Sequence, residues 1–182
     1  MTNLQMEIKK NRVAEVILLQ VLQSIVDDKY FIEDVADNEE CYHLGDVKVT
    51  DRDGNIAYYD AKNDGVIHKT GRVFCESHKY FFNTMKKHTG FMEDGNYDYL
   101  SVVDRVDKKI YILDFKILKS IYKDYKEVQT TLKDCYSYGT VIPLDECRKE
   151  KALVYTINYD GDDSCYYALD VINEQGYSAI RL

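Results

Sequence analysis

The chain has 182 residues, enough for one domain with a full hydrophobic core, and it contains no apolar run of about 18 residues that would predict a membrane span. Its net charge of −8 argues against a simple high-affinity DNA-binding protein, because phosphate contacts require Lys and Arg. The five cysteines are scattered without a CxxC pair, and the polar N-terminus lacks a signal-peptide pattern. Free thiols in a cytoplasmic protein are therefore expected.

The first predicted element is a helix from about Gln5 to Val26. Apolar residues recur there at helical spacing, and Gly and Pro do not interrupt the segment. Glu15 lies inside the apolar band, where an unpaired carboxylate is costly. It lies either on the solvated edge of the helix or toward a functional site. Residues 27–40 follow as an acidic connector.

Two strands and a tight turn come next. Residues 41–50 and 56–62 are predicted strands, and the sequence between them, DRDGN, has the composition of a turn. Side chains alternate across a strand, so Asp60 and Lys62 are expected on one face. The hairpin is expected to bring Asp46 next to them.

A third strand is predicted over residues 70–76, TGRVFCE, and Glu76 at its end adds a further carboxylate. Two or three carboxylates around one lysine suit a hard cation such as Mg²⁺ or Mn²⁺, with a water held near the lysine. Carboxylates this close repel one another, and a divalent cation or an ammonium group offsets the repulsion. The sequence therefore predicts a divalent-metal site formed by Asp46, Asp60 and Glu76 beside Lys62.

The spacing of these residues resembles the PD-(D/E)XK nuclease superfamily. Asp46 matches the first acid, and Asp60-Ala61-Lys62 matches the D-x-K motif. Residues 70–76 match a strand pattern of small phage and bacterial endonuclease-like proteins, and the resemblance covers about residues 45–122. One departure is that Gly45 stands where the family pattern has a proline.

The resemblance implies an α+β fold with a restriction-endonuclease-like α-β-β-β-α-β core, in a single domain over residues 1–182. It implies Mg²⁺- or Mn²⁺-dependent hydrolysis of DNA, with Asp46, Asp60, Lys62 and Glu76 as catalytic residues. Glu15 on the first helix is the position that matches a further metal ligand of the family. DNA is the expected partner, and a homodimer is left open. The alternative is a catalytically inactive module on the same fold that binds a nucleic acid or a protein.

The remainder of the chain is predicted to hold two hairpins and two helices, the second helix directly after Pro143. The last hairpin is expected to extend the edge of the sheet, and residues 125–138 are expected to be polar and partly loop. These elements are residues 97–104 and 109–114 (first hairpin), 115–123 (helix), 144–149 (helix), and 152–159 and 164–169 (last hairpin).

The first of these hairpins contains a rival D-x-K motif, Asp114-Phe115-Lys116, with Asp104 upstream. No further acidic strand follows this motif at a suitable distance. Lys116 also falls in the first turn of the predicted helix, away from the strand face. We therefore prefer the site around Asp60.

Overall fold

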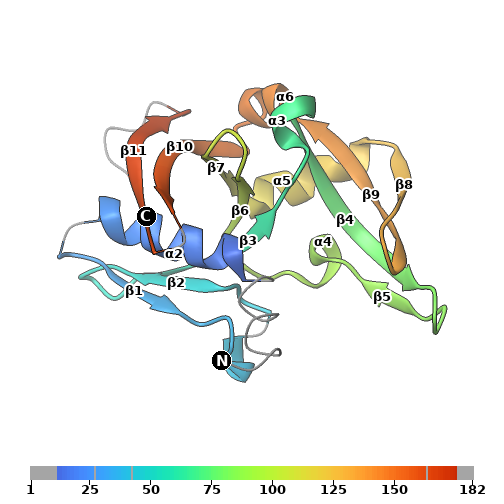
Figure 1. Cartoon of the computed structure of the whole chain (residues 1–182), viewed down its shortest axis with the longest axis horizontal. Helices are drawn as coiled ribbons and strands as arrows, with labels where there is room; N and C mark the ends of the chain where they lie inside the picture. Colours follow the sequence, from blue (N-terminus) through green and yellow to red (C-terminus); the bar gives the residue numbers. More distant parts are fainter. Residues whose placement is uncertain (1–11, 27, 42, 163, 176–182) are drawn as a thin grey trace.

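The structure is a computed structural model that describes residues 12–26, 28–41, 43–162 and 164–175 (Figure 1). The fold is mixed α+β, with a seven-stranded mixed sheet and a separate four-stranded antiparallel sheet. The α+β class with a mixed sheet agrees with the prediction from sequence. Among the described residues, no helix is long and apolar enough to cross a membrane.

The large sheet has the strand order β1-β2-β3-β6-β7-β10-β11. Its neighbours pair antiparallel, except that β3 and β6 run parallel. The C-terminal hairpin extends one edge, as predicted. The strands are β1 Phe31–Asp34, β2 Val47–Thr50, β3 Ile56–Asn63, β6 Tyr99–Asp104, β7 Lys109–Asp114, β10 Leu153–Asp162 and β11 Cys165–Asn173.

Helix α2, Val13–Ile25, packs across one face of the large sheet (Figure 1). Its buried residues recur at the three- and four-residue spacing that predicted the helix from sequence. The predicted start at Gln5 lies outside the described residues. The buried face of the helix consists of Ala14, Ile17, Leu18, Val21 and Leu22. This face and the inward side chains of β2 and β3 form one hydrophobic core.

The small sheet has the strand order β5-β4-β9-β8 and stands to the right of the large sheet in Figure 1. Its strands come from two crossovers of the large sheet, residues 64–98 between β3 and β6 and residues 115–152 between β7 and β10. A second core joins the two sheets and includes Val73, Leu100 and Leu118. The strands are β4 Arg72–Phe81, β5 Lys87–Thr89, β8 Glu127–Thr131 and β9 Cys135–Pro143.

Two expectations about this region are corrected. The third predicted strand is β4, which lies in the small sheet and not beside the first two strands, and its ten residues place Glu76 inside the strand and not at its end. The segment 125–138, expected to be partly loop, contains β8 and the start of β9. β8 is an exposed edge strand, so it lacks the alternating apolar residues that reveal a strand in sequence.

The short helices connect the strands. The hairpin over β6 and β7 and the helix that follows it are observed as predicted, and so is the helix after Pro143. The connector over residues 27–40 contains the edge strand β1 and a 3₁₀ turn. The helices are α3 Ile67–Thr70, α4 Phe91–Asp94, α5 Phe115–Ile121 and α6 Leu144–Lys149, with 3₁₀ helices η1 Glu39–Cys41 and η2 Tyr122–Asp124.

Candidate active site

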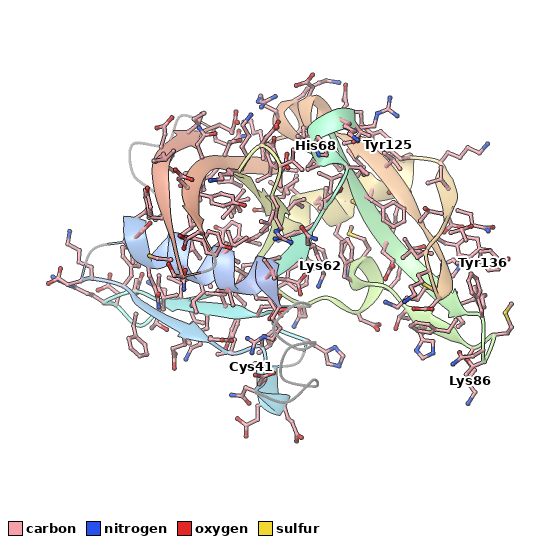
Figure 2. The ribbon with its side chains drawn as sticks, in the orientation of Figure 1. Cys41, Lys62, His68, Lys86, Tyr125 and Tyr136 are labelled. Atoms are coloured by element: carbon pink, nitrogen blue, oxygen red, sulfur yellow. The ribbon has the colours of Figure 1, made fainter. Side chains whose placement is uncertain are left out.

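A cleft of ≈ 940 Å³ lies between the two sheets. One wall comes from β3 and the segment before β2, and the opposite wall comes from β4, β8 and β9. Lys62 projects from β3 at this wall (Figure 2). Four of the residues predicted from sequence to form the site line the cleft: Asp46, Asp60, Lys62 and Glu76.

Asp46 lies directly before β2 and extends the hydrogen bonding between β2 and β3. Its backbone N–H donates to Tyr59 O at 2.8 Å, and its Oδ2 accepts the backbone N–H of Ala61 at 2.8 Å. The Asp46 carboxylate thus accepts the hydrogen bond that a backbone carbonyl would accept if the pairing of the two strands continued. This bond fixes the side chain beside Asp60, the neighbour of Ala61 in β3.

Gly45 makes this arrangement sterically possible. Its φ is +127°, and a Cβ built on it falls 2.7 Å from Tyr59 O, too close for any side chain. A proline cannot adopt this φ, because its ring holds φ near about −65°. The glycine therefore has a structural reason for standing where the resembled family has proline. The same turn explains why the strand predicted over residues 41–50 begins only at Val47.

Asp60 and Lys62 lie on the cleft face of β3, while Tyr59 and Ala61 pack under α2, as the alternation along the strand predicted. Lys62 Nζ is 2.7 Å from Asp60 Oδ2. The Asp60 side chain is 12% exposed and that of Lys62 is 42% exposed. The Lys62 ammonium group thus compensates the charge of the buried Asp60 carboxylate.

The charges of this wall perturb one another. Burial and, after it, the nearby charge of Asp60 raise the pKa of Asp46 to about 6, although the Ala61 N–H and Lys62 act in the opposite direction. Burial works to lower the pKa of Lys62, but the charges of Asp60 and Asp46 outweigh it, so this pKa is raised. Two carboxylates therefore compete for one ammonium group.

Glu15, in the first turn of α2, lies behind this wall. Its charge contributes to the raised pKa values of Asp46 and Lys62, so it is close to the cluster. It is not among the described residues that line the cleft, and its carboxylate binds Arg12. Arg12 also binds Asp34 at 2.7 Å. The structure thus brings Glu15 near the site but engages it in an ion-pair network.

Glu76 borders the cleft from the opposite wall. Its Oε2 accepts a hydrogen bond from Ser137 Oγ at 2.7 Å, and its Oε1 lies 3.4 Å from Lys79 Nζ. Gly90 packs against its backbone, where a Cβ would fall 2.5 Å from Glu76 O. Among the described residues, no three His, Cys, Asp or Glu side chains form a group that could hold a metal ion. Glu76 thus lines the cleft from the small sheet, whereas Asp60 lines it from the large sheet.

Tyr97 is a cleft residue that sequence reasoning missed. Its side chain is buried, and its hydroxyl has no hydrogen-bond partner among the described residues. Burial raises the pKa of Tyr97, and the charges of Asp60, Cys75 and Asp46 raise it further, which places the hydroxyl near the carboxylates. The only sequence signal is its position just before β6, the strand that runs parallel to β3.

The rival D-x-K motif serves structural roles. In the β6–β7 pair, Asp104 faces Lys109 at one end and Tyr99 faces Asp114 at the other, so the two aspartates lie at opposite ends of the hairpin. Asp114 is the N-cap of α5 and accepts the N–H of Ile117 at 2.9 Å.

Comparisons of the chain with family models, with curated proteins and with solved structures found no match. The nuclease resemblance therefore stays a prediction. It depends on Asp46, on the Asp60-Ala61-Lys62 motif and on residues 70–76. The geometry of the cleft is the structural basis on which a function can be proposed.

Proposed function

We propose that the protein is a metal-dependent nuclease that hydrolyses phosphodiester bonds of DNA. The observation that carries the proposal is the convergence of Asp46, Asp60 and Lys62 on one wall of a cleft. In the proposed core, α2, β2, β3 and β6 correspond to the restriction-endonuclease-like arrangement. In this assignment β4 has moved from the central sheet into the small sheet.

The residues of this wall fit a hard divalent cation. Asp46 and Asp60 offer carboxylate oxygens, and the pKa of Asp46 is raised by burial and by repulsion from Asp60, both of which a bound cation would offset. The buried Tyr97 hydroxyl has an unused donor and acceptor beside them, suited to a bound water or a substrate oxygen. Mg²⁺ or Mn²⁺ held by Asp46 and Asp60 would polarise the phosphate and make a bound water more acidic.

The remaining roles fall to side chains of the chain itself. Lys62 positions the attacking water and stabilises the negative charge that develops on the phosphoryl group. Glu76 faces the reacting group from the opposite wall, where Ser137 holds its carboxylate. Glu15 supports the site through its charge and, with Arg12 displaced, is the further candidate ligand.

The second candidate function is a catalytically inactive binding module on the same fold. The observation that favours it is the Lys62–Asp60 ion pair, which engages the carboxylate that a cation needs. The net charge of −8 also disfavours non-specific DNA affinity. In this function the cleft would hold a nucleic acid or a protein segment without cutting it.

Cleavage assays with a matched lysine variant test the proposal. Lys62→Ala removes the lysine of the preferred motif, and Lys116→Ala removes the lysine of the rival motif. Linear and circular DNA, in single- and double-stranded form, are incubated with Mg²⁺ or Mn²⁺, with EDTA as the negative control. We expect metal-dependent cutting that Lys62→Ala lowers by roughly 10²–10³-fold and that Lys116→Ala leaves unchanged.

Two outcomes would contradict the nuclease. If the wild-type protein cuts none of these DNAs, the binding module replaces it. If wild type and Lys62→Ala cut equally, the activity belongs to a contaminant. Metal binding by Lys62→Ala, followed as a thermal shift, verifies that the variant keeps its carboxylate pair.

A further inference from the structure

The two segments that contain the small sheet have a charge opposite to that of the rest of the molecule. Residues 72–89, which contain β4 and β5, hold four Lys and Arg against one Glu. Residues 126–143, which contain β8 and β9, hold two Lys against two acidic residues. These two segments, turns included, therefore have a net charge of +3, whereas the whole chain has −8, so −11 remains for the other residues. Of the four cations in residues 72–89, Arg72 and Lys79 line the cleft.

The cleft face of this sheet combines cations with exposed apolar side chains. Arg72 and Phe74 alternate with inward residues along β4, and Lys79 lies farther along the same strand at the cleft. Val128 and Leu132, at the β8 edge of this wall, are 38% and 49% exposed. The wall thus combines cations with exposed apolar side chains, which suits a ligand that has both charged and apolar parts.

We propose that the small-sheet wall binds an unpaired DNA strand and holds it against Asp46, Asp60 and Lys62. Arg72 and Lys79 contact its phosphates. The apolar side chains contact the faces of its bases. The inference rests on the proposed function for the position of the reacting phosphate.

An unpaired strand fits this wall better than a duplex does. A duplex presents phosphates and sugars to an approaching surface and keeps its base faces stacked inside. A single strand exposes the base faces, which pack on apolar and aromatic side chains without regard to sequence. Phe91, whose ring lies 5.9 Å from Lys62 Nζ, gives the cleft an aromatic surface next to the proposed reaction site.

The charge part of the proposal is tested by binding without metal, so that cleavage does not interfere. Fluorescence anisotropy with a labelled single-stranded oligonucleotide in EDTA compares Arg72→Ala/Lys79→Ala with Arg105→Ala/Lys116→Ala. The second pair removes the same charge from exposed positions away from the cleft. We expect the cleft pair to make the slope of log affinity against log salt less negative by about 1.4, at about 0.7 for each phosphate contact. Equal slopes for the two double variants would overturn the proposal.

The apolar part is tested by a change that leaves charge untouched. Leu132→Ser removes a half-exposed apolar side chain from the cleft, and Val106→Ser removes one from the β6–β7 turn, where Val106 is 62% exposed. We expect Leu132→Ser to weaken single-strand binding about fivefold and Val106→Ser to leave it unchanged. Tighter binding of a duplex than of the single strand, or an equal effect of the two variants, would overturn the unpaired-strand assignment.

The two proposals can fail separately. Single-strand binding that depends on Arg72 and Lys79, without any cutting in Mn²⁺, would support the binding role of this wall and contradict the nuclease proposal. Cutting of duplex DNA without measurable single-strand binding would support the nuclease proposal and contradict the proposal that this wall binds an unpaired strand. A protein that neither binds nor cuts DNA would contradict both.

Discussion

The two walls of the cleft differ in how they hold charge. On the large-sheet wall, Asp46 and Asp60 are packed against a strand pair, and each is fixed by a specific partner. On the small-sheet wall, Arg72 is exposed, and so are the apolar side chains of Val128 and Leu132 at the β8 edge. Fixed, partly desolvated charges suit a reaction, because their interactions are stronger away from water. Exposed and mixed side chains suit the adaptable binding of a flexible ligand.

The largest expected effect is a difference between the two walls: a substitution on the large-sheet wall should abolish the stabilisation by metal, and one on the small-sheet wall should not. Asp60→Asn should abolish the rise in melting temperature that Mn²⁺ produces in the wild type, because a ligand that binds only the folded state stabilises it. It should also lower cutting by at least about 10²-fold. Glu76→Gln, on the opposite wall, should keep the thermal response to Mn²⁺. Loss of that response in Glu76→Gln alone would place the cation on the small sheet.

The next effect concerns the backbone that positions Asp46. Gly45→Ala should lower the free energy of unfolding by about 3 kcal/mol, because a side chain at φ +127° would also collide with Tyr59 O. Gly54→Ala is the control: its φ is +81°, but nothing lies within 4 Å of an added Cβ, so only about 1 kcal/mol is expected. Urea unfolding of both variants measures the difference. Equal losses would show that the close approach at Gly45 costs nothing.

The large-sheet wall is the part of the site that sequence reveals, because it forms within a single hairpin. The turn composition and the side-chain alternation place Asp46, Asp60 and Lys62 without information from the rest of the chain. Gly45 stood out in the sequence as a departure from proline, but its reason needed the position of Tyr59 O in the partner strand. Local patterns therefore predict which side chains converge and not the backbone geometry that permits it.

The small-sheet wall is hidden from sequence because its partners are remote along the chain. Glu76 pairs with Gly139, and the two strands belong to different crossovers of the large sheet. Nothing local to residues 70–76 distinguishes a strand in the central sheet from one in a second sheet. Tyr97 was missed for a similar reason, since its burial depends on residues from both sheets.

A smaller effect is expected from the pH dependence of stability. The pKa of Asp46 is raised from 3.8 to about 6, so the folded protein holds this proton more tightly than the unfolded chain does. The stability from this group is therefore present at low pH and is lost as pH rises from about 4 to about 6, on the order of 3 kcal/mol. Asp46→Asn, which can still accept the Ala61 N–H, should remove that loss.

Urea unfolding in EDTA at a series of pH values measures this effect. The difference in unfolding free energy between wild type and Asp46→Asn should grow with pH across this range, with the variant the more stable at neutral pH. Parallel curves for the two proteins would show that folding does not raise the pKa of Asp46.

The smallest effect tests how firmly the small sheet holds Glu76. Ser137→Ala removes the buried hydroxyl that donates to Glu76 Oε2 and should lower the free energy of unfolding by about 1 kcal/mol. Ser120→Ala is the control, because the Ser120 hydroxyl is exposed and donates to a carbonyl of its own helix. No loss is expected there. A Ser137→Ala variant as stable as wild type would mean that Lys79 alone holds the carboxylate.

The pairing of β4 with β9 has a consequence for the order of events during synthesis. Their partners range from Phe81 with Cys135 to Arg72 with Pro143, so the ribosome makes β4 between 54 and 71 residues before β9. During that interval the nascent β4 has only the three-residue β5 as a neighbour in its sheet. One full edge of this ten-residue strand then has unpaired backbone N–H and C=O groups, with which a strand of another chain can pair wrongly. Slow elongation through residues 82–134 would therefore favour aggregation of this protein, whereas release of the complete chain closes the edge.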